Sequence, residues 1–124
     1  MFVIDETEAR TTRTPSGVMT ALAGPSQGST ELSTWRVRME ADAEGPVHTI
    51  DREQVWMPLT GSLAFTVDGV AATASAGQAA VLPAGVVRQV RVAEGPAEAL
   101  VCMSIGGQAR VPGNDEPRPL PWAQ

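Results

Sequence analysis

A chain of 124 residues with 43% hydrophobic residues has the size of one domain and enough apolar material for one core. Its formal charge is −5, and its nine positive residues are all arginines without a basic run, which excludes the electrostatic footprint of a nucleic-acid-binding protein. No apolar run approaches the roughly 18 residues of a membrane-spanning helix, so we expect no membrane partner.

The N-terminus and the cysteine content indicate the compartment. Residues 1–6 contain an acidic residue by position 5 and lack the basic start of a signal peptide. Cys102 is the only cysteine, so it cannot form an intrachain disulfide, and it fits a reducing environment. We therefore expect a cytoplasmic protein. The abundance of alanine, glycine and arginine without lysine suggests a GC-rich bacterial genome.

Short strands dominate the chain, because its ten prolines and twelve glycines leave few windows of helical length. Residues 1–33 are predicted to hold strands and a polar loop, 24–30, that pack on the rest. The segment 34–40 is the clearest strand: Trp35, Val37 and Met39 share one face, and Arg36 and Arg38 share the other.

The middle of the chain continues this pattern. Alternation predicts a strand over 63–67, a tight turn at Asp68-Gly69 and a return strand over 70–76. A short apolar run at 79–82 ends in a turn at 83–85, and two further strands are expected at 86–92 and 99–105, separated by 94–96. About nine strands at this spacing are typical of an all-β sandwich or barrel.

The C-terminal residues 106–124 contain four prolines and no alternation. They predict either an extended arm that covers the barrel or a neighbouring subunit, with Trp122 as an anchor, or a loosely ordered tail. We thus expect one domain, with an N-terminal part (1–33), a barrel core (34–105) and a proline-rich arm (106–124).

Two blocks of the chain, 45–61 and 77–92, carry a family resemblance. Gly61 closes the first block, and Gly77, Pro83 and Gly85 punctuate the second, each at the spacing of the two cupin motifs. The chain therefore resembles a small single-domain cupin, which implies an all-β jelly-roll barrel. The family's habit, together with the strand edges that an open barrel leaves uncovered, implies a homodimer.

The resemblance also identifies the positions where metal-binding cupins carry their ligands. His48 is retained, but the other three positions hold Ile50, Gln54 and Arg88. A guanidinium only donates hydrogen bonds and cannot ligate a cation. Since metals in proteins usually need three or four His, Cys or carboxylate ligands, we expect no metal and no other cofactor. A residual site of His48, Gln54 and Cys102 stays open if Cys102 faces the interior.

Strand parity places the replacements together. His48, Gln54 and Trp56 share one face, and the resemblance implies that Arg88 enters the same cavity. Such a cavity suits a small, partly apolar metabolite with a carboxylate, enolate or phenolate. His48 would move a proton and Arg88 would stabilise negative charge as the catalytic pair. Gln54, Trp56 and Cys102 would bind the ligand.

Each residue also has a structural interpretation. His48 and Gln54 can simply satisfy the fold, and Arg88 can pair internally with Glu53 or another acid. Trp56 can be core, and Cys102 can be a small buried apolar residue.

Three functions follow from these residues. The first is a metal-independent isomerase, cyclase or epimerase, as some cupins are. The second is a non-catalytic small-molecule binding module, which the same cavity explains equally well. The third is a metal-dependent dioxygenase or lyase, which the residues at the ligand positions disfavour.

Overall fold

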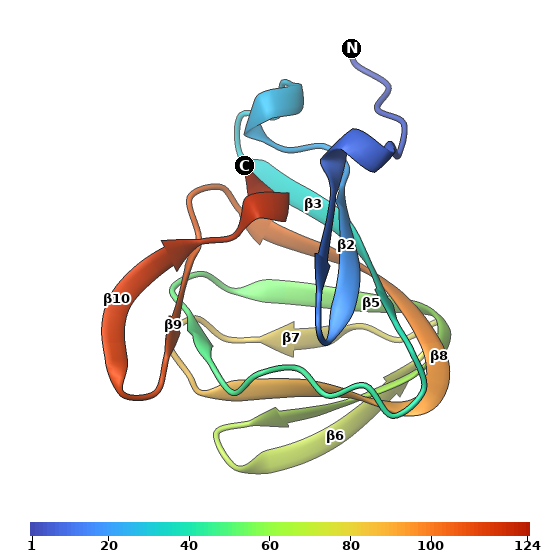
Figure 1. The fold of residues 1–124 in the computed structure, drawn as a ribbon, viewed down its shortest axis with the longest axis vertical. Coiled ribbons are helices and arrows are strands. Elements are labelled where there is room, and N and C mark those ends of the chain that lie inside the picture. Colours follow the sequence, from blue (N-terminus) through green and yellow to red (C-terminus); the bar gives the residue numbers. More distant parts are fainter.

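The computed structural model describes residues 1–124 and consists almost entirely of strands (Figure 1). Its only helices are three single turns of 3₁₀ helix. In chain order the elements are η1 (Glu8–Arg10), β1 (Thr11–Thr14), β2 (Gly17–Ala21), η2 (Pro25–Gln27), β3 (Leu32–Met39), β4 (Thr49–Ile50), β5 (Gln54–Val67), β6 (Val70–Ser75), β7 (Ala80–Leu82), β8 (Arg88–Ser104), β9 (Gln108–Val111), β10 (Asn114–Pro119) and η3 (Pro121–Ala123).

The strands form a jelly-roll barrel, as predicted. The larger sheet runs β1-β2-β3-β8-β5-β6, with β7 also paired to β5, and a smaller sheet runs β10-β9-β4. The long strands β5 and β8 pair along their whole length and so take part in both layers of the barrel. The second half of β8 pairs with β3, whereas its first half bridges to residues 44–48. The alternation in β3 is confirmed, because Trp35, Val37 and Met39 are all buried.

The expectation of two separate strands at 86–92 and 99–105 is wrong. The structure has one continuous strand, β8, in which Glu94 still pairs with Ser62 and Glu98 pairs with Thr60 of β5. The glycine and proline between them therefore bend the strand through shifts in register rather than ending it. The predicted hairpin at Asp68-Gly69 is confirmed: both residues have positive φ, as the mirror-image turn of a two-residue hairpin requires.

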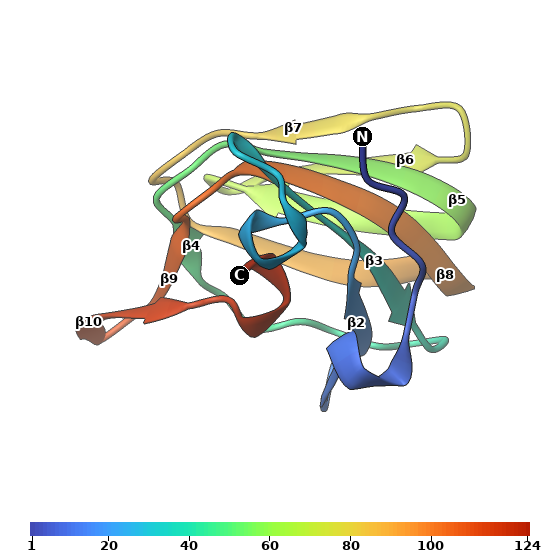
Figure 2. The ribbon, with the colours of Figure 1, turned by 90° about the horizontal axis from the view of Figure 1, so that it is seen from above.

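The C-terminal residues are an arm on the barrel, but they are more structured than the lack of alternation indicated. Residues 108–119 form a hairpin of β9 and β10, and β9 pairs with β4. The chain then ends in η3, which lies beside the loop that contains η2 (Figure 2). Ser33, which is fully buried, donates its hydroxyl to the Ala123 carbonyl at 2.6 Å. This contact fixes the arm on the end of β3.

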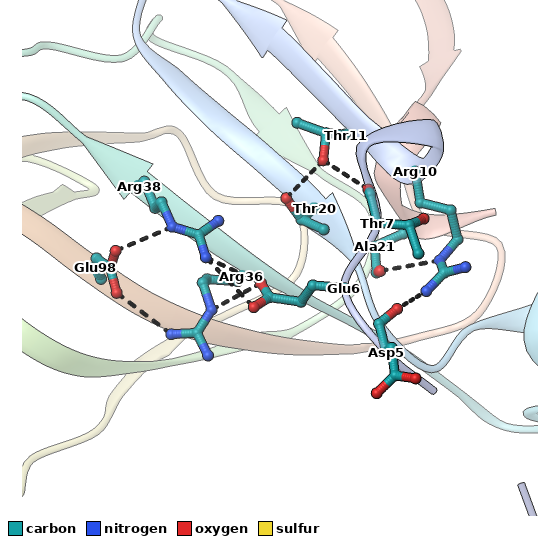
Figure 3. Close-up of polar contacts among 10 residues, drawn as sticks. All are labelled: Asp5, Glu6, Thr7, Arg10, Thr11, Thr20, Ala21, Arg36, Arg38 and Glu98. Carbon is teal, nitrogen blue, oxygen red and sulfur yellow. Dashed lines mark hydrogen bonds and ion pairs between the residues drawn. The ribbon is translucent and has the colours of Figure 1, made fainter. Parts of the chain in front are cut away.

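The N-terminal residues are held on the outer face of the same sheet by a closed ring of charges (Figure 3). Glu6 accepts from Arg36 at 2.8 Å and from Arg38 at 3.2 Å, and Glu98 of β8 accepts from the same two arginines at 3.4 and 3.0 Å. Because each charge has two opposite neighbours, the ring is a better stabiliser than an isolated surface pair. It leaves the outward arginines of β3 engaged on the side away from the core.

Gly61 provides a test of how the two long strands meet. Its φ is +66°, and a Cβ added there would lie 2.5 Å from the carbonyl oxygens of both Glu94 and Pro96. We expect Gly61→Ala to lower the free energy of unfolding by about 3 kcal/mol or more, from backbone strain and this clash. Gly77→Ala is the control, because Gly77 also has positive φ but has nothing within 4 Å of an added Cβ. That change should cost only about 1 kcal/mol in urea unfolding. Equal losses in the two variants would contradict the clash.

Candidate functional site

The barrel contains a cavity of about 680 Å³ between its two layers and the C-terminal arm. This volume is in the usual range for small-molecule sites. The walls are mainly apolar, and a few polar groups interrupt them. The residues that line it include Met19, Trp35, Met39, Glu44, His48, Ile50, Gln54, Trp56, Arg118 and Trp122.

His48 lies on a short extended segment that pairs with the first half of β8. The backbones of His48 and Arg88 exchange two hydrogen bonds, of 3.0 and 2.9 Å. The imidazole is half-buried, and its Nδ1 lies 2.8 Å from the Pro46 carbonyl. A carbonyl only accepts, so in the neutral ring Nδ1 carries the proton and Nε2 keeps its lone pair. Nε2 makes no hydrogen bond within the protein, which leaves it available to a ligand in the cavity.

The pKa of His48 is lowered below its usual value of 6.5. The largest cause is burial, which disfavours the charged ring. The hydrogen bond to Pro46 acts in the opposite direction, and the positive charge of Arg88 lowers the pKa further. At neutral pH the ring is therefore neutral and basic at Nε2.

Gln54 and Trp56 come from the beginning of β5 and line the same cavity as His48. Gln54 is buried, with 3% exposure. Its Oε1 accepts from the Trp56 indole at 3.2 Å, and its Nε2 lies 3.6 Å from the sulfur of Met103. Trp56 also packs edge-on against Phe65, with ring centroids 5.8 Å apart. These contacts lock both side chains, and the amide still has a second N–H free for a ligand.

Arg88 lies beside His48, but its guanidinium does not line the cavity. The side chain is 1% exposed and turns back onto the turn before β8, where Nε donates to the Val86 carbonyl at 3.1 Å and Nη2 donates to the Pro83 carbonyl. Nη1 is buried without a partner. The expectation that Arg88 enters the cavity is therefore wrong, because the side chain folds back onto these carbonyls. The structural alternative, an internal pairing with Glu53 or another acid, is not met either, since no ion pair of the structure includes Arg88. Burial lowers the pKa of the guanidinium, which nevertheless remains a cation.

Cys102 lies on the outer face of the sheet. Its neighbours in the strand, Val101 and Met103, are buried in the core, so Cys102 points to the opposite side. Across the strands it is paired with Thr34 and Val55, and it does not line the cavity. The condition for a residual metal site with Cys102, an inward thiol, is therefore not met.

The comparison with protein families matches a cupin domain to residues 35–105, more than half of the chain. The chain belongs to the cupin family. A comparison with curated protein sequences finds no matching relative. Among the solved structures similar to this cupin is oxalate decarboxylase from Bacillus subtilis, with a TM-score of 0.73 and 15% identity. That match covers 82% of this chain but 29% of the decarboxylase, so this cupin spans less than a third of that protein.

Two smaller proteins are similar over nearly their full length. KdgF from Halomonas sp. has a TM-score of 0.68 and 18% identity, over 84% of this chain and 92% of KdgF. An RmlC-like cupin from Shewanella frigidimarina has a TM-score of 0.66 and 21% identity, over 82% of this chain and 92% of the other. At these identities the likeness shows a shared barrel. In addition, none of the helices of this cupin is long and apolar enough to cross a membrane.

The residues at the family's ligand positions do not fit a metal ion. Ile50 is 1% exposed and adds a hydrocarbon wall, and Arg88 adds a positive charge that repels a cation. His48 and Gln54 remain as one imidazole and one amide. Nowhere does the structure gather three His, Cys, Asp or Glu side chains that could hold a metal. The donor set thus falls short of the three or four ligands that such ions need.

Sequence reasoning missed the charged groups at the rim of the cavity. Arg118 of β10 and Glu44, next to the His48 segment, both border it. Arg118 is exposed and so offers a guanidinium to a ligand. The proline-rich sequence around Arg118 contains no alternation or motif that points to the cavity. Only the hairpin in three dimensions brings it there.

His48 gives a pH prediction that is easy to isolate, because it is the only histidine. Its folded pKa is below its unfolded value of about 6.5, so on acidification the unfolded chain takes up this proton first. We expect the contribution of His48 to the free energy of unfolding to fall as pH drops from about 6.5 toward the folded pKa. Below the folded pKa this contribution should stay constant. His48→Gln should lack this contribution. The ring protons of His48, followed by NMR, should titrate below about 6.5, and a midpoint above that value would contradict the assignment.

Proposed function

We propose that this cupin binds a small, partly apolar metabolite bearing a carboxylate, enolate or phenolate, and that His48 transfers a proton on it without a metal ion. The observation that carries the proposal is the free Nε2 of His48 in an otherwise mainly apolar cavity. A neutral imidazole with one nitrogen fixed by a carbonyl is oriented as a general base. Gln54, held by Trp56, would hydrogen-bond the ligand's polar group through its free N–H.

The charge of Arg88 supports an anionic ligand. Its two hydrogen-bond partners are carbonyls, which are neutral, so its positive charge is not cancelled by a carboxylate. A positive field next to His48 lowers the basicity of the ring, and it equally stabilises an anion that forms beside the ring. Arg88 would therefore act through its field rather than by direct contact. Arg118, at the rim, is the guanidinium placed to contact a ligand carboxylate.

The reaction consistent with these groups is an acid–base isomerisation. His48 Nε2 takes a proton from a carbon next to a carbonyl, and the electron pair of that C–H bond moves into an enolate. His48 then returns the proton to another carbon. In an epimerisation, water protonates the other face and His48 releases its proton to solvent. In a cyclisation, the enolate carbon attacks a second carbonyl, and the alkoxide that forms takes the proton from His48. No oxidant or metal is needed. These are the isomerase, epimerase and cyclase outcomes.

The chief alternative is a binding module with no turnover. The same cavity, amide and rim charges suit capture of an anion, and proton transfer rests on one residue. A metal-dependent dioxygenase or lyase is opposed by Ile50 and Arg88 at the ligand positions. Assembly as a homodimer stays an expectation from the family and does not enter the chemistry proposed here.

Deuterium exchange tests the proposal. Protein dialysed against a chelator would be mixed in D₂O with 4-methyl-2-oxopentanoate, an aliphatic anion with exchangeable protons at C3. We expect the C3 signal to disappear faster than in buffer, and His48→Gln to slow this exchange by about 100-fold or more. Cys102→Ser is the matched control, because its side chain lies outside the cavity, and it should exchange like the wild type.

The outcomes separate the alternatives. Binding of the 2-oxo acid, seen as a raised melting temperature, without exchange would leave the binding module in place of the enzyme. Exchange that requires added metal would overturn the metal-independent mechanism. If the 2-oxo acid neither binds nor exchanges, that result would contradict the proposal for this ligand class.

A further inference from the structure

All the tryptophans of the chain border the one large cavity. The chain contains three tryptophans and no tyrosine. Trp35 comes from β3, Trp56 from β5 and Trp122 from η3, and each lines the cavity. These elements are far apart in the sequence, and the third belongs to the C-terminal arm. Indoles from three separate elements thus form part of the mainly apolar walls of the cavity.

Two of the three indoles keep exposed surface, whereas Trp35 is 2% exposed and belongs to the core. Trp56 is fixed at its N–H by Gln54 and packs against Phe65 at an interplanar angle of 74°. Trp56 and Trp122 nevertheless remain half-buried, with surface on the cavity. A tryptophan that served packing alone would be covered by neighbouring side chains. The exposed surfaces of these two indoles, next to an open volume, provide stacking surfaces for a flat ligand.

Aromatic walls can hold either a cation or a planar ring, and the charges nearby decide between them. An indole face attracts a quaternary ammonium group. The uncancelled guanidinium of Arg88 next to His48, however, repels a cation in the cavity. At the rim, Glu44 and Arg118 carry opposite charges, so the rim as a whole favours neither a cation nor an anion and Arg88 decides. A ring that is neutral or anionic is favoured.

We infer that the ligand of this cavity contains a planar conjugated ring, seated against the indoles of Trp56 and Trp122 with its anionic group toward Arg118 or His48. This assignment rests on the proposed function, since it names the ligand class of the same site. A saturated ring contacts an indole face through its C–H groups, whereas a planar conjugated ring adds offset stacking of the two π systems. Ring planarity is thus the property that we expect the cavity to favour.

NMR of the tryptophan side chains tests the assignment on the wild-type protein. Three indole N–H signals are expected, one from each tryptophan. The probes are 2-naphthoate and its saturated counterpart, decalin-2-carboxylate, which share charge and outline. We expect 2-naphthoate to shift the signals of Trp56 and Trp122 by its ring current and to bind about three- to tenfold more tightly than the saturated acid.

Variants at the rim separate stacking from simple packing. Trp122→Leu should remove most of the preference for 2-naphthoate over decalin-2-carboxylate, and Trp122→Phe should restore part of it. Phe2→Leu is the control, because Phe2 is 72% exposed and does not line the cavity. The preference is a ratio of two affinities measured on the same protein, so a moderate loss of stability lowers both affinities and leaves the ratio unchanged.

The results distinguish this inference from the proposed function. Equal affinity for the two acids, or tighter binding of the saturated one, overturns the planar-ring assignment and leaves an anion-binding cavity. Preference for phenyltrimethylammonium over 2-naphthoate overturns both the assignment and the anionic ligand. Failure of both acids to bind, while 4-methyl-2-oxopentanoate binds, overturns the planar ring alone. Failure of all three anions overturns the proposed function as well.

Discussion

The shape of the molecule depends on the place where β5 and β8 bend together. The two strands stay paired throughout, so neither can turn from one layer into the other unless its partner turns at the same point. Gly61 makes this possible, because its missing Cβ leaves room for the backbone carbonyls of Glu94 and Pro96. On one side of the bend lies Trp56 of β5. On the other side, the first half of β8 pairs with the segment that contains His48. Closing the barrel at this point is what makes them line one cavity.

The second constraint is the buried charge of Arg88. A charge with 1% exposure is costly unless its hydrogen bonds are replaced, and the carbonyls of Pro83 and Val86 replace two of them. These carbonyls solvate the guanidinium without neutralising it. A carboxylate partner would have supplied similar hydrogen bonds and cancelled the field. The positive field of Arg88 therefore acts on His48, whose pKa is lowered by burial and, in addition, by that field.

Local patterns predicted the fold well, and they predicted the site as far as strand parity determines it. Parity places Cβ atoms on a face, which correctly put His48, Gln54 and Trp56 together. It says nothing about a long side chain that folds back, so the turn of Arg88 onto the carbonyls of Pro83 and Val86 was not predictable. For Cys102 the surrounding residues are apolar on both faces of the strand, and only pairing with β3 and β5 shows which side is inward. The rim residues on the arm depend on contacts between the ends of the chain, which no local pattern encodes.

The departures at the cupin ligand positions change the kind of chemistry the barrel supports. A bound metal would provide positive charge and open coordination positions together. Here Arg88 occupies one ligand position and supplies a permanent positive charge, but a guanidinium offers no coordination position. Ile50 occupies another and adds hydrocarbon where a ligand would contribute a polar atom. With His48 the one titratable ligand left, the proton transfer that we propose would take place near a fixed charge, in a cavity whose other walls are mainly apolar.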